Sequence, residues 1–267
     1  MDLAEVVDLD RYPVHDEGRR AALVAHAAQQ LTDRSVAVLP GFVRPAALER
    51  MVDDCDTLLP LAHRSESDAS PYLSAPDPTL PPAHPRARHQ ASQVSTVAYD
   101  LVPPTAPVRV LYESEVLLGF LAAVLGVDRL YRYDDPFGAL NLSTMHAGDA
   151  LAWHFDQTDF VTSLAVSAPE SGGAFEVAAQ VRTSEDERYE QVAAVLDGDR
   201  SAVTHVEFRP GSLMLFAGRH SLHRVTAVEG GRPRHVALLA YDTRPGTDST
   251  DELKLARYGR LPGGTPS

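Results

Sequence analysis

The chain has 267 residues, of which 44% are hydrophobic and 23% charged, and this composition excludes a disordered or collagen-like protein. Its 24 Lys and Arg residues against 37 Asp and Glu residues give a net charge of −13, which argues against nucleic acid or a membrane surface as a partner. The single cysteine, Cys55, excludes an internal disulfide and a Cys-x-x-Cys zinc site. We expect a cytoplasmic protein, because no signal peptide is visible and no apolar run reaches the ~18 residues of a membrane span.

The N-terminal part of the chain, residues 1–128, predicts a helical support layer. Helical patterns cover residues 18–31, 45–59 and 108–125, and a short strand with a Pro-Gly turn lies at 35–43. Residues 63–95 are rich in Ser, Pro, Asp and His and show no periodicity. We therefore expect these residues to form a long loop that acts as a lid over the substrate.

From residue 129 to residue 245, short apolar segments alternate with turn signals, which is typical of a sandwich or barrel. One helical insertion is expected at 184–196, and the tail, 259–267, is expected to be flexible. The whole chain, 1–267, is predicted to form one mostly β domain. The predicted strands are 130–133, 139–145, 151–155, 160–167, 173–177, 204–208, 212–216, 222–228 and 234–241.

The sequence Trp153-His154-Phe155-Asp156 lies on one of these strands. Residues two apart on a strand face the same way, so His154 and Asp156 project together. An imidazole and a carboxylate on one face are two thirds of the facial triad that binds iron(II). Either His220 or His223, but not both, can face the same site from a later strand. The pair His205 and Glu207 has the same spacing, and we interpret it as an ordinary pair on a strand surface.

Two arginines follow the distal histidine, at the start of the last predicted strand. Arg232 and Arg234 share a strand face, and a guanidinium at the mouth of a barrel binds a carboxylate with two hydrogen bonds. The alternative is a surface turn with two solvated arginines.

Together, His154-x-Asp156, His223 and a trailing arginine resemble the signature of the iron(II)/2-oxoglutarate-dependent dioxygenases. The fold of that superfamily is a double-stranded β-helix, also called a jelly roll, with a cupin-like core. Further segments are similar to its branch of free amino-acid halogenases and hydroxylases. These segments are residues 170–176, 211–219 and 221–226, together with Asp135-Pro136 and His84-Pro85-Arg86.

The resemblance implies a cofactor set of Fe(II), 2-oxoglutarate and O2. His154, Asp156 and His223 would hold the iron, and Arg234 would bind the distal carboxylate of 2-oxoglutarate, with Arg232 as the alternative. Asn141 on an early strand is expected to line the cosubstrate site. Halogenases of this branch replace the metal-binding carboxylate with a small residue, whereas this chain keeps the aspartate. We therefore expect a hydroxylase that releases succinate and CO2.

The branch resemblance also implies a small, free amino-acid-like substrate as the binding partner. The candidate residues for binding it are Arg86, which the resemblance favours, and Arg88, Gln157, Asp159 and His146. Each of them is also compatible with an ordinary structural role. Three other functions stay open: desaturation or cyclisation by the same oxidant, a metal-dependent hydrolase or lyase on a cupin-like barrel, and a binding protein without activity.

Overall fold

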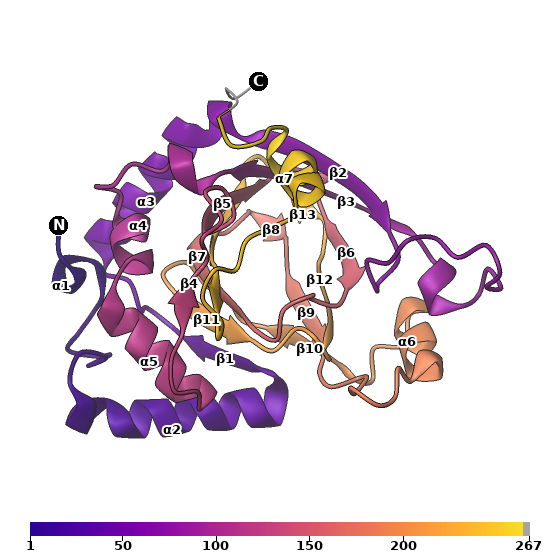
Figure 1. Ribbon diagram of the computed structural model, residues 1–267, viewed down its shortest axis with the longest axis horizontal. Coiled ribbons are helices and arrows are strands. Elements are labelled where there is room, and N and C mark those ends of the chain that lie inside the picture. Colours follow the sequence, from indigo (N-terminus) through magenta and orange to yellow (C-terminus); the bar gives the residue numbers. More distant parts are fainter. Residues whose placement is uncertain (264–267) are drawn as a thin grey trace.

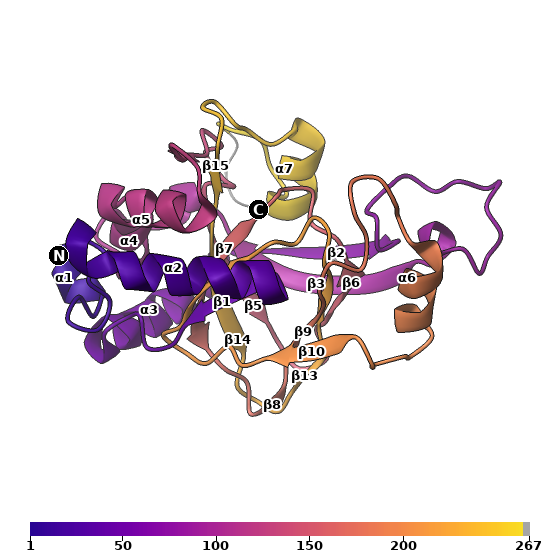
Figure 2. The same ribbon diagram turned by 90° about the horizontal axis from the view of Figure 1, so that it is seen from below.

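The computed structural model describes residues 1–263, and the helices of its first 125 residues gather along one side of a β core (Figures 1 and 2). Asp16 and Ser114 cap the N-termini of α2 and α5 with their side chains, and Gly126 ends α5 in the left-handed conformation that suits glycine. Within the described part of the chain, no helix has the length and apolar character to cross a membrane. The helices on this side are α1 (Leu3–Val6), α2 (Glu17–Arg34), α3 (Pro45–Leu58), α4 (Pro107–Tyr112) and α5 (Glu115–Leu125).

A seven-stranded antiparallel sheet faces these helices (Figure 1). Each of its inner strands pairs with neighbours that are distant in sequence; for example, β14 lies between β7 and β5. In spatial order the strands are β1 (Val36–Leu39), β11 (Leu213–Phe216), β7 (Val161–Ser167), β14 (Arg234–Leu239), β5 (Leu140–Met145), β3 (Gln90–Val97) and β2 (His63–Ala69).

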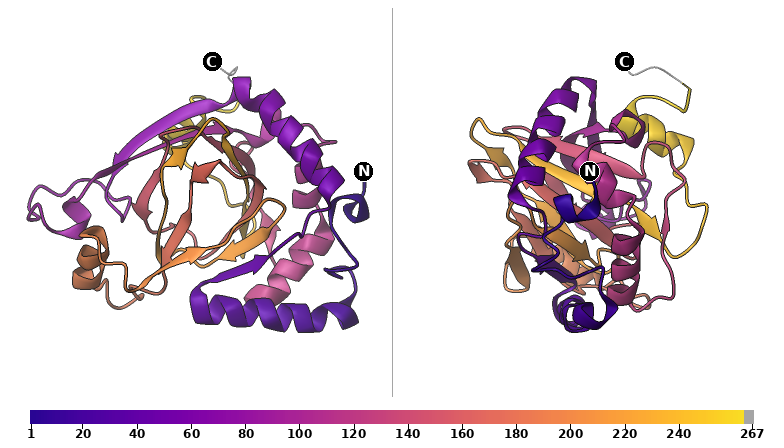
Figure 3. Two further views of the ribbon diagram at one scale, coloured as in Figure 1. Left: turned by 180° about the vertical axis from the view of Figure 1, so that it is seen from behind. Right: turned by 90° about the vertical axis from the view of Figure 1, so that its left-hand side faces the viewer.

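A four-stranded sheet lies opposite the larger one, and the two enclose the interior of the barrel (Figure 3). The predicted jelly-roll core with a helical support layer is thereby confirmed. In spatial order the strands of the small sheet are β10 (Val203–Val206), β9 (Phe175–Ala178), β12 (Leu222–Val225) and β6 (Leu151–His154). Two short ribbons complete the β structure: β8 (Ser171–Gly172) with β13 (Val228–Glu229), and β4 (Tyr131–Arg132) with β15 (Tyr241–Asp242).

Strand β11 shows how the two faces of the large sheet are used. Leu213 and Leu215 pack into the hydrophobic cluster that contains the helices, whereas Met214 and Phe216 belong to a separate cluster between the sheets. All four side chains are buried. The sequence of this strand is a continuous apolar run because both of its faces are covered.

The expectation of a structureless stretch over 63–95 is wrong. Strands β2 and β3 pair over seven residues, from His63 with Thr96 to Ala69 with Gln90, and extend the large sheet. The loop is therefore limited to residues 70–89, which contain the short 3-10 helix η2 (Pro85–Ala87). Periodicity missed β2 because this edge strand is mostly polar and carries no alternating apolar face.

The rest of the chain adds two helices and two short 3-10 turns. α6 (Tyr189–Leu196) occupies the second half of the expected insertion at 184–196, and α7 (Asp251–Tyr258), which we did not predict, packs on β2 and β3. The turns are η1 (Leu59–Leu61) and η3 (Tyr99–Leu101). Part of the tail expected to be flexible, 264–267, lies outside the described residues.

An ion pair ties the edge of the large sheet to the turn between β5 and β6. The guanidinium of Arg64 on β2 donates to both carboxylate oxygens of Asp149, at 2.6 and 2.7 Å. The side chain of Asp149 is only 6% exposed, and it also accepts a hydrogen bond from the backbone N–H of His146. The hairpin is thus held to the barrel by an ion pair whose carboxylate is buried.

We predict that Arg64→Met lowers the free energy of unfolding by about 1–3 kcal/mol, because it leaves the buried carboxylate without its main donor. Urea denaturation measures this change. Arg19→Met, at an exposed position on α2, is the matched control and should shift the stability by less than about 0.5 kcal/mol. An equal effect of the two substitutions would contradict the assigned role of the ion pair.

Candidate metal centre

Three side chains with metal-binding groups meet inside the barrel, where β6 pairs with β12. His154 lies directly opposite His223 in the register of the two strands, and their ring centroids are 4.1 Å apart. Asp156 follows β6, and its Oδ1 lies 3.9 Å from His154 Nε2 and 3.5 Å from His223 Nε2. The three ligand atoms lie within 4.8 Å of one another, which is close enough to bind a single ion.

Backbone carbonyls orient both imidazole rings. The Nδ1 of His154 donates to the carbonyl of Ala152 at 2.8 Å, and the Nδ1 of His223 donates to the carbonyl of Ser221 at 3.0 Å. In each case the acceptor lies two residues earlier in the chain. With the proton on Nδ1, the lone pair of Nε2 points to the centre of the cluster, as a metal ligand requires.

The electrostatics of the cluster keep His154 and Asp156 in the state that binds a cation. Burial, aided by the neighbouring His223, lowers the pKa of His154 to about 4, so its ring is neutral at neutral pH. Burial alone would raise the pKa of Asp156, but His223 and His154 hold it below its usual value. Its buried Oδ2 has no hydrogen-bond partner among the described residues. Two imidazoles and a carboxylate with an unused oxygen fit iron(II).

The other histidines on these strands lie outside the cluster. His223 is buried in the barrel against Phe216, with ring centroids 4.6 Å apart, whereas His220 belongs to the segment before β12. His205 is exposed on β10, and Glu207, also exposed, pairs with Arg209. The second His-x-acid motif is therefore a surface pair, in keeping with its interpretation from sequence.

A half-buried cation without a counter-charge lies on β14. Arg234 is opposite Met145 in the register, and its Nη1 lies 3.9 Å from the sulfur of Met145. Burial lowers the pKa of Arg234 to about 10, and within residues 1–263 no carboxylate pairs with it. A buried guanidinium is costly unless an anion compensates it, which suits the carboxylate of a bound cosubstrate. Arg232, in contrast, is exposed and donates only to the carbonyl of Pro169, at 3.4 Å.

Asn141 lies on β5, but its amide is already engaged. Its Oδ1 accepts a hydrogen bond from the hydroxyl of Tyr258 at 2.8 Å, and its Nδ2 donates to the carbonyl of Phe137 at 3.2 Å. Because Tyr258 is the last residue of α7, these bonds fix that helix to the barrel. The structure thus gives Asn141 a positioning contact that the sequence did not indicate.

Most of the residues expected to bind substrate have other partners. Arg88 pairs with Asp197 at 2.7 Å, and Asp159 pairs with Arg219. The side chain of Gln157 donates to the carbonyl of Tyr72 at 3.4 Å. The two remaining candidates have no such ion pair among the described residues. His146 is exposed at the turn after β5, and Arg86 lies half-buried in η2.

One cation near the metal cluster was missed by sequence reasoning. Burial and His223 are the main causes of the lowered pKa of His154, and the two histidines are the main causes of the lowered pKa of Asp156; Arg257 on α7 adds the smallest contribution to each. Its side chain is exposed, and in the described part of the chain no carboxylate forms an ion pair with it. The only signal in the sequence was an amphipathic stretch at 251–258 with a threonine N-cap, Thr250, which predicts a helix but not its location.

Comparison with known proteins agrees with this geometry. The sequence profile of halogenase D matches residues 19–255, which is most of the chain. The chain belongs to the halogenase D family. No curated protein matches it in sequence.

Solved structures resemble this halogenase D family member in fold, at low identity. The epimerase SnoN in complex with Fe3+, alpha ketoglutarate and nogalamycin RO has a TM-score of 0.58, with 14% identity over 92% of this chain and 93% of that one. AviO1 from Streptomyces viridochromogenes Tue57 has a TM-score of 0.57, with 16% identity over 84% and 96%. A 2OG-Fe(II) oxygenase family oxidoreductase from Burkholderia pseudomallei has a TM-score of 0.53, with 15% identity over 84% and 92%.

The expected superfamily is thereby confirmed. The halogenase D family member is an oxidoreductase with the jelly-roll fold. The cluster of His154, Asp156 and His223 and the unpaired Arg234 fit the expected cofactor set of Fe(II), 2-oxoglutarate and O2, because iron needs the former and a dicarboxylate needs the latter.

We predict that Gly218→Ala abolishes tight iron binding while the protein stays folded. The carbonyl of Gly218 accepts a hydrogen bond from the backbone N–H of Asp156 at 3.2 Å. A methyl group at Gly218 would overlap the carboxylate of Asp156 and push it from the cluster. Titration with iron(II) under argon measures the loss, which should exceed tenfold in affinity, or about 1.4 kcal/mol.

Gly119→Ala is the matched control. Gly119 lies in α5, and a methyl group there would meet nothing within 4 Å, so iron affinity should not change. Unaltered iron affinity in a folded Gly218→Ala protein would show that Asp156 is not held as described.

Proposed function

We propose that this protein is a non-haem iron(II)/2-oxoglutarate-dependent oxygenase that hydroxylates an unactivated C–H bond of a small, free amino-acid-like substrate, with release of succinate and CO2. The observation that carries the proposal is the half-buried, unpaired guanidinium of Arg234 in a barrel that also contains three residues that could hold a metal ion. A metal-dependent hydrolase would use the same triad but has no need of this charge.

The three residues of the cluster and Arg234 each have a part in the proposed reaction. His154, Asp156 and His223 would hold iron on one face and leave three positions for other ligands. Arg234 would bind the distal carboxylate of 2-oxoglutarate and so orient the end that chelates the metal. When bound, iron and 2-oxoglutarate supply a dioxygen-derived oxidant that is strong enough for an aliphatic C–H bond.

The retained aspartate supports hydroxylation over halogenation. The branch resemblance links halogenation to a small residue at this position, which leaves room for a halide at the metal. Here Asp156 lies within 4 Å of both histidines and fills that place. The name of the family therefore does not describe the reaction that we propose for this member.

We propose that Arg257 binds the carboxylate of the substrate. This guanidinium is solvent-exposed, carries no ion pair within residues 1–263, and acts electrostatically on His154 and Asp156. A free amino acid offers a carboxylate that such a cation can bind. Gln157, Arg86 and His146 stay predictions as further substrate contacts, as does a cytoplasmic location.

The first test needs no substrate. Iron(II) is added under argon to the protein with 2-oxoglutarate, and the weak visible charge-transfer band of the chelate is recorded. We expect the band in the unmodified protein, a much weaker band at equal 2-oxoglutarate concentration in Arg234→Leu, and none in His154→Ala. Arg232→Leu is the matched control and should keep the full band.

The absence of the band from folded, iron-loaded protein would refute the oxygenase proposal and favour the hydrolytic alternative. A band that depends on Arg232 rather than Arg234 would refute the assigned anchor alone. Once the band has been observed, succinate release is measured with a panel of free amino acids.

For Arg257, we predict that Arg257→Gln raises the KM of an amino-acid substrate about 10- to 100-fold, which corresponds to the loss of one charged hydrogen bond. The charge-transfer band should not change. Arg244→Gln is the control, because Arg244 is also an exposed arginine and lies outside α7. If the unmodified protein does not prefer an amino acid over its amide, Arg257 does not bind the carboxylate.

A further inference from the structure

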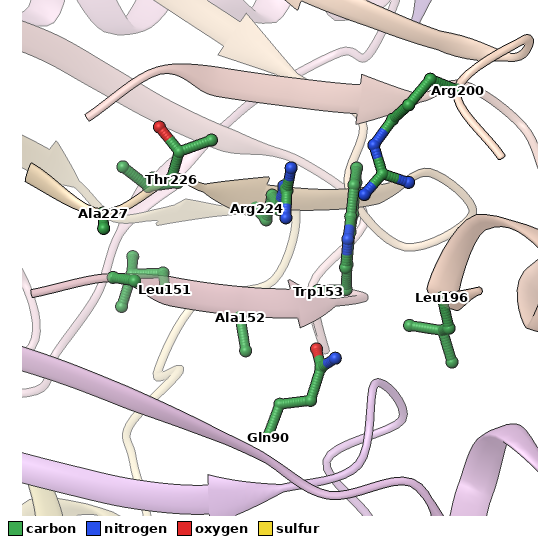
Figure 4. A pocket seen from close by; sticks show the side chains of 11 residues that line it. Gln90, Leu151, Ala152, Trp153, Leu196, Arg200, Arg224, Thr226 and Ala227 are labelled. Atoms are coloured by element: carbon green, nitrogen blue, oxygen red, sulfur yellow. The ribbon is translucent and has the colours of Figure 1, made fainter. Parts of the chain in front are cut away.

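A cavity of about 230 Å³ lies on the opposite side of β6 from the metal cluster (Figure 4). Strands β6 and β12 form its floor, Gln90 at the start of β3 forms one wall, and Leu196 at the end of α6 forms another. Trp153 faces this cavity because its neighbour His154 faces the barrel interior. The cavity is thus separate from the proposed active site, although one strand lines both.

Two guanidinium groups flank Trp153 in this cavity. The guanidinium carbon of Arg224 lies 4.7 Å from the ring centroid of Trp153, and that of Arg200 lies 5.5 Å from it. Figure 4 shows the indole standing between the two arginine side chains. Stacking on an aromatic face holds a guanidinium in place while it leaves the N–H groups at its edge free for a ligand.

The arginines have more donors than the protein uses. Arg224 pairs through Nε with Glu176 at 2.7 Å, and Arg200 donates through Nη1 to the carbonyls of Val195 and Asp199. Across residues 1–263 the remaining N–H groups of both side chains have no hydrogen bond, and Glu176 is the one carboxylate that pairs with either. One positive charge is therefore left over, in a chain whose net charge is −13.

We propose that this cavity binds a small molecule with a carboxylate or phosphate group. The free edges of Arg200 and Arg224 would hold the anionic group, since guanidinium forks match both oxyanions. The aliphatic side chains of Leu151 and Leu196 would contact a short apolar body. The volume is below the ~300 Å³ at which pockets for drug-sized ligands begin, so the ligand has only a few carbon atoms.

A ligand in this cavity would change the orientation of His154 at the candidate metal centre, because both sites share the backbone of β6. The register between β6 and β12 shifts here, so that Ala152 and Trp153 lie opposite the single residue Arg224. The carbonyl of Ala152 is the group that orients His154. A ligand against Trp153 therefore contacts the residues that set the direction of a metal ligand.

The only tryptophan of the chain, Trp153, provides the measurement. Its fluorescence is followed while sodium phosphate, sodium succinate or sodium butyrate is added at constant ionic strength. The protein is loaded with iron(II) and 2-oxoglutarate under argon, which blocks the active site, and is also titrated without them. We expect a saturable change in both states, and the ranking of the three probes separates phosphate from carboxylate ligands.

Arg200→Gln should weaken the binding of the best probe at least tenfold, and Arg200→Lys, which keeps the charge but loses the fork, should weaken it less. Arg209→Gln, at an exposed arginine after β10, is the matched control and should titrate like the unmodified protein. Thermal melting verifies that each variant is folded. A response that does not saturate with any probe, or that is the same in folded Arg200→Gln, would overturn the proposal.

Discussion

The pairing of β6 with β12 is the contact on which the candidate metal centre of this protein depends. It brings His154 and His223 face to face, although 68 residues separate them in the chain. Because side chains alternate along a strand, the same pairing sends Trp153 to the outer face, where it packs toward α6. The metal centre and the outer cavity are therefore two consequences of one register. A slip of one residue would exchange their residues and destroy both.

A second feature of the structure is that several arginine side chains have no carboxylate paired with them. The chain is strongly acidic, yet Arg234 is half-buried without a carboxylate, and Arg257 and Arg200 have no ion pair among the described residues. The buried carboxylate of Asp149, in contrast, is matched by Arg64. Each of these three guanidinium groups stands where we propose that an anion from outside the protein binds.

The sequence could predict what depends on local periodicity. Strand parity alone put His154 and Asp156 on one face, and the motif context chose His223, which lies in the cluster. Parity could not predict partners that are distant in the chain. Nothing near Arg88 indicates that Asp197 pairs with it, and nothing in residues 251–258 indicates that α7 lies against β2 and β3. Edge strand β2 was missed because its polar side chains have no core face.

The position of β14 in the large sheet bears on how the protein is made. This strand is among the last core strands to leave the ribosome, yet it sits between β7 and β5, which emerge much earlier. Until β14 arrives, those two strands have unpaired edges that face each other across a gap. Because β14 also carries Arg234, the step that closes the barrel during synthesis is the step that brings in the proposed cosubstrate anchor. An incomplete chain with its three metal ligands would still lack that anchor, so maturation of the site is tied to completion of the fold.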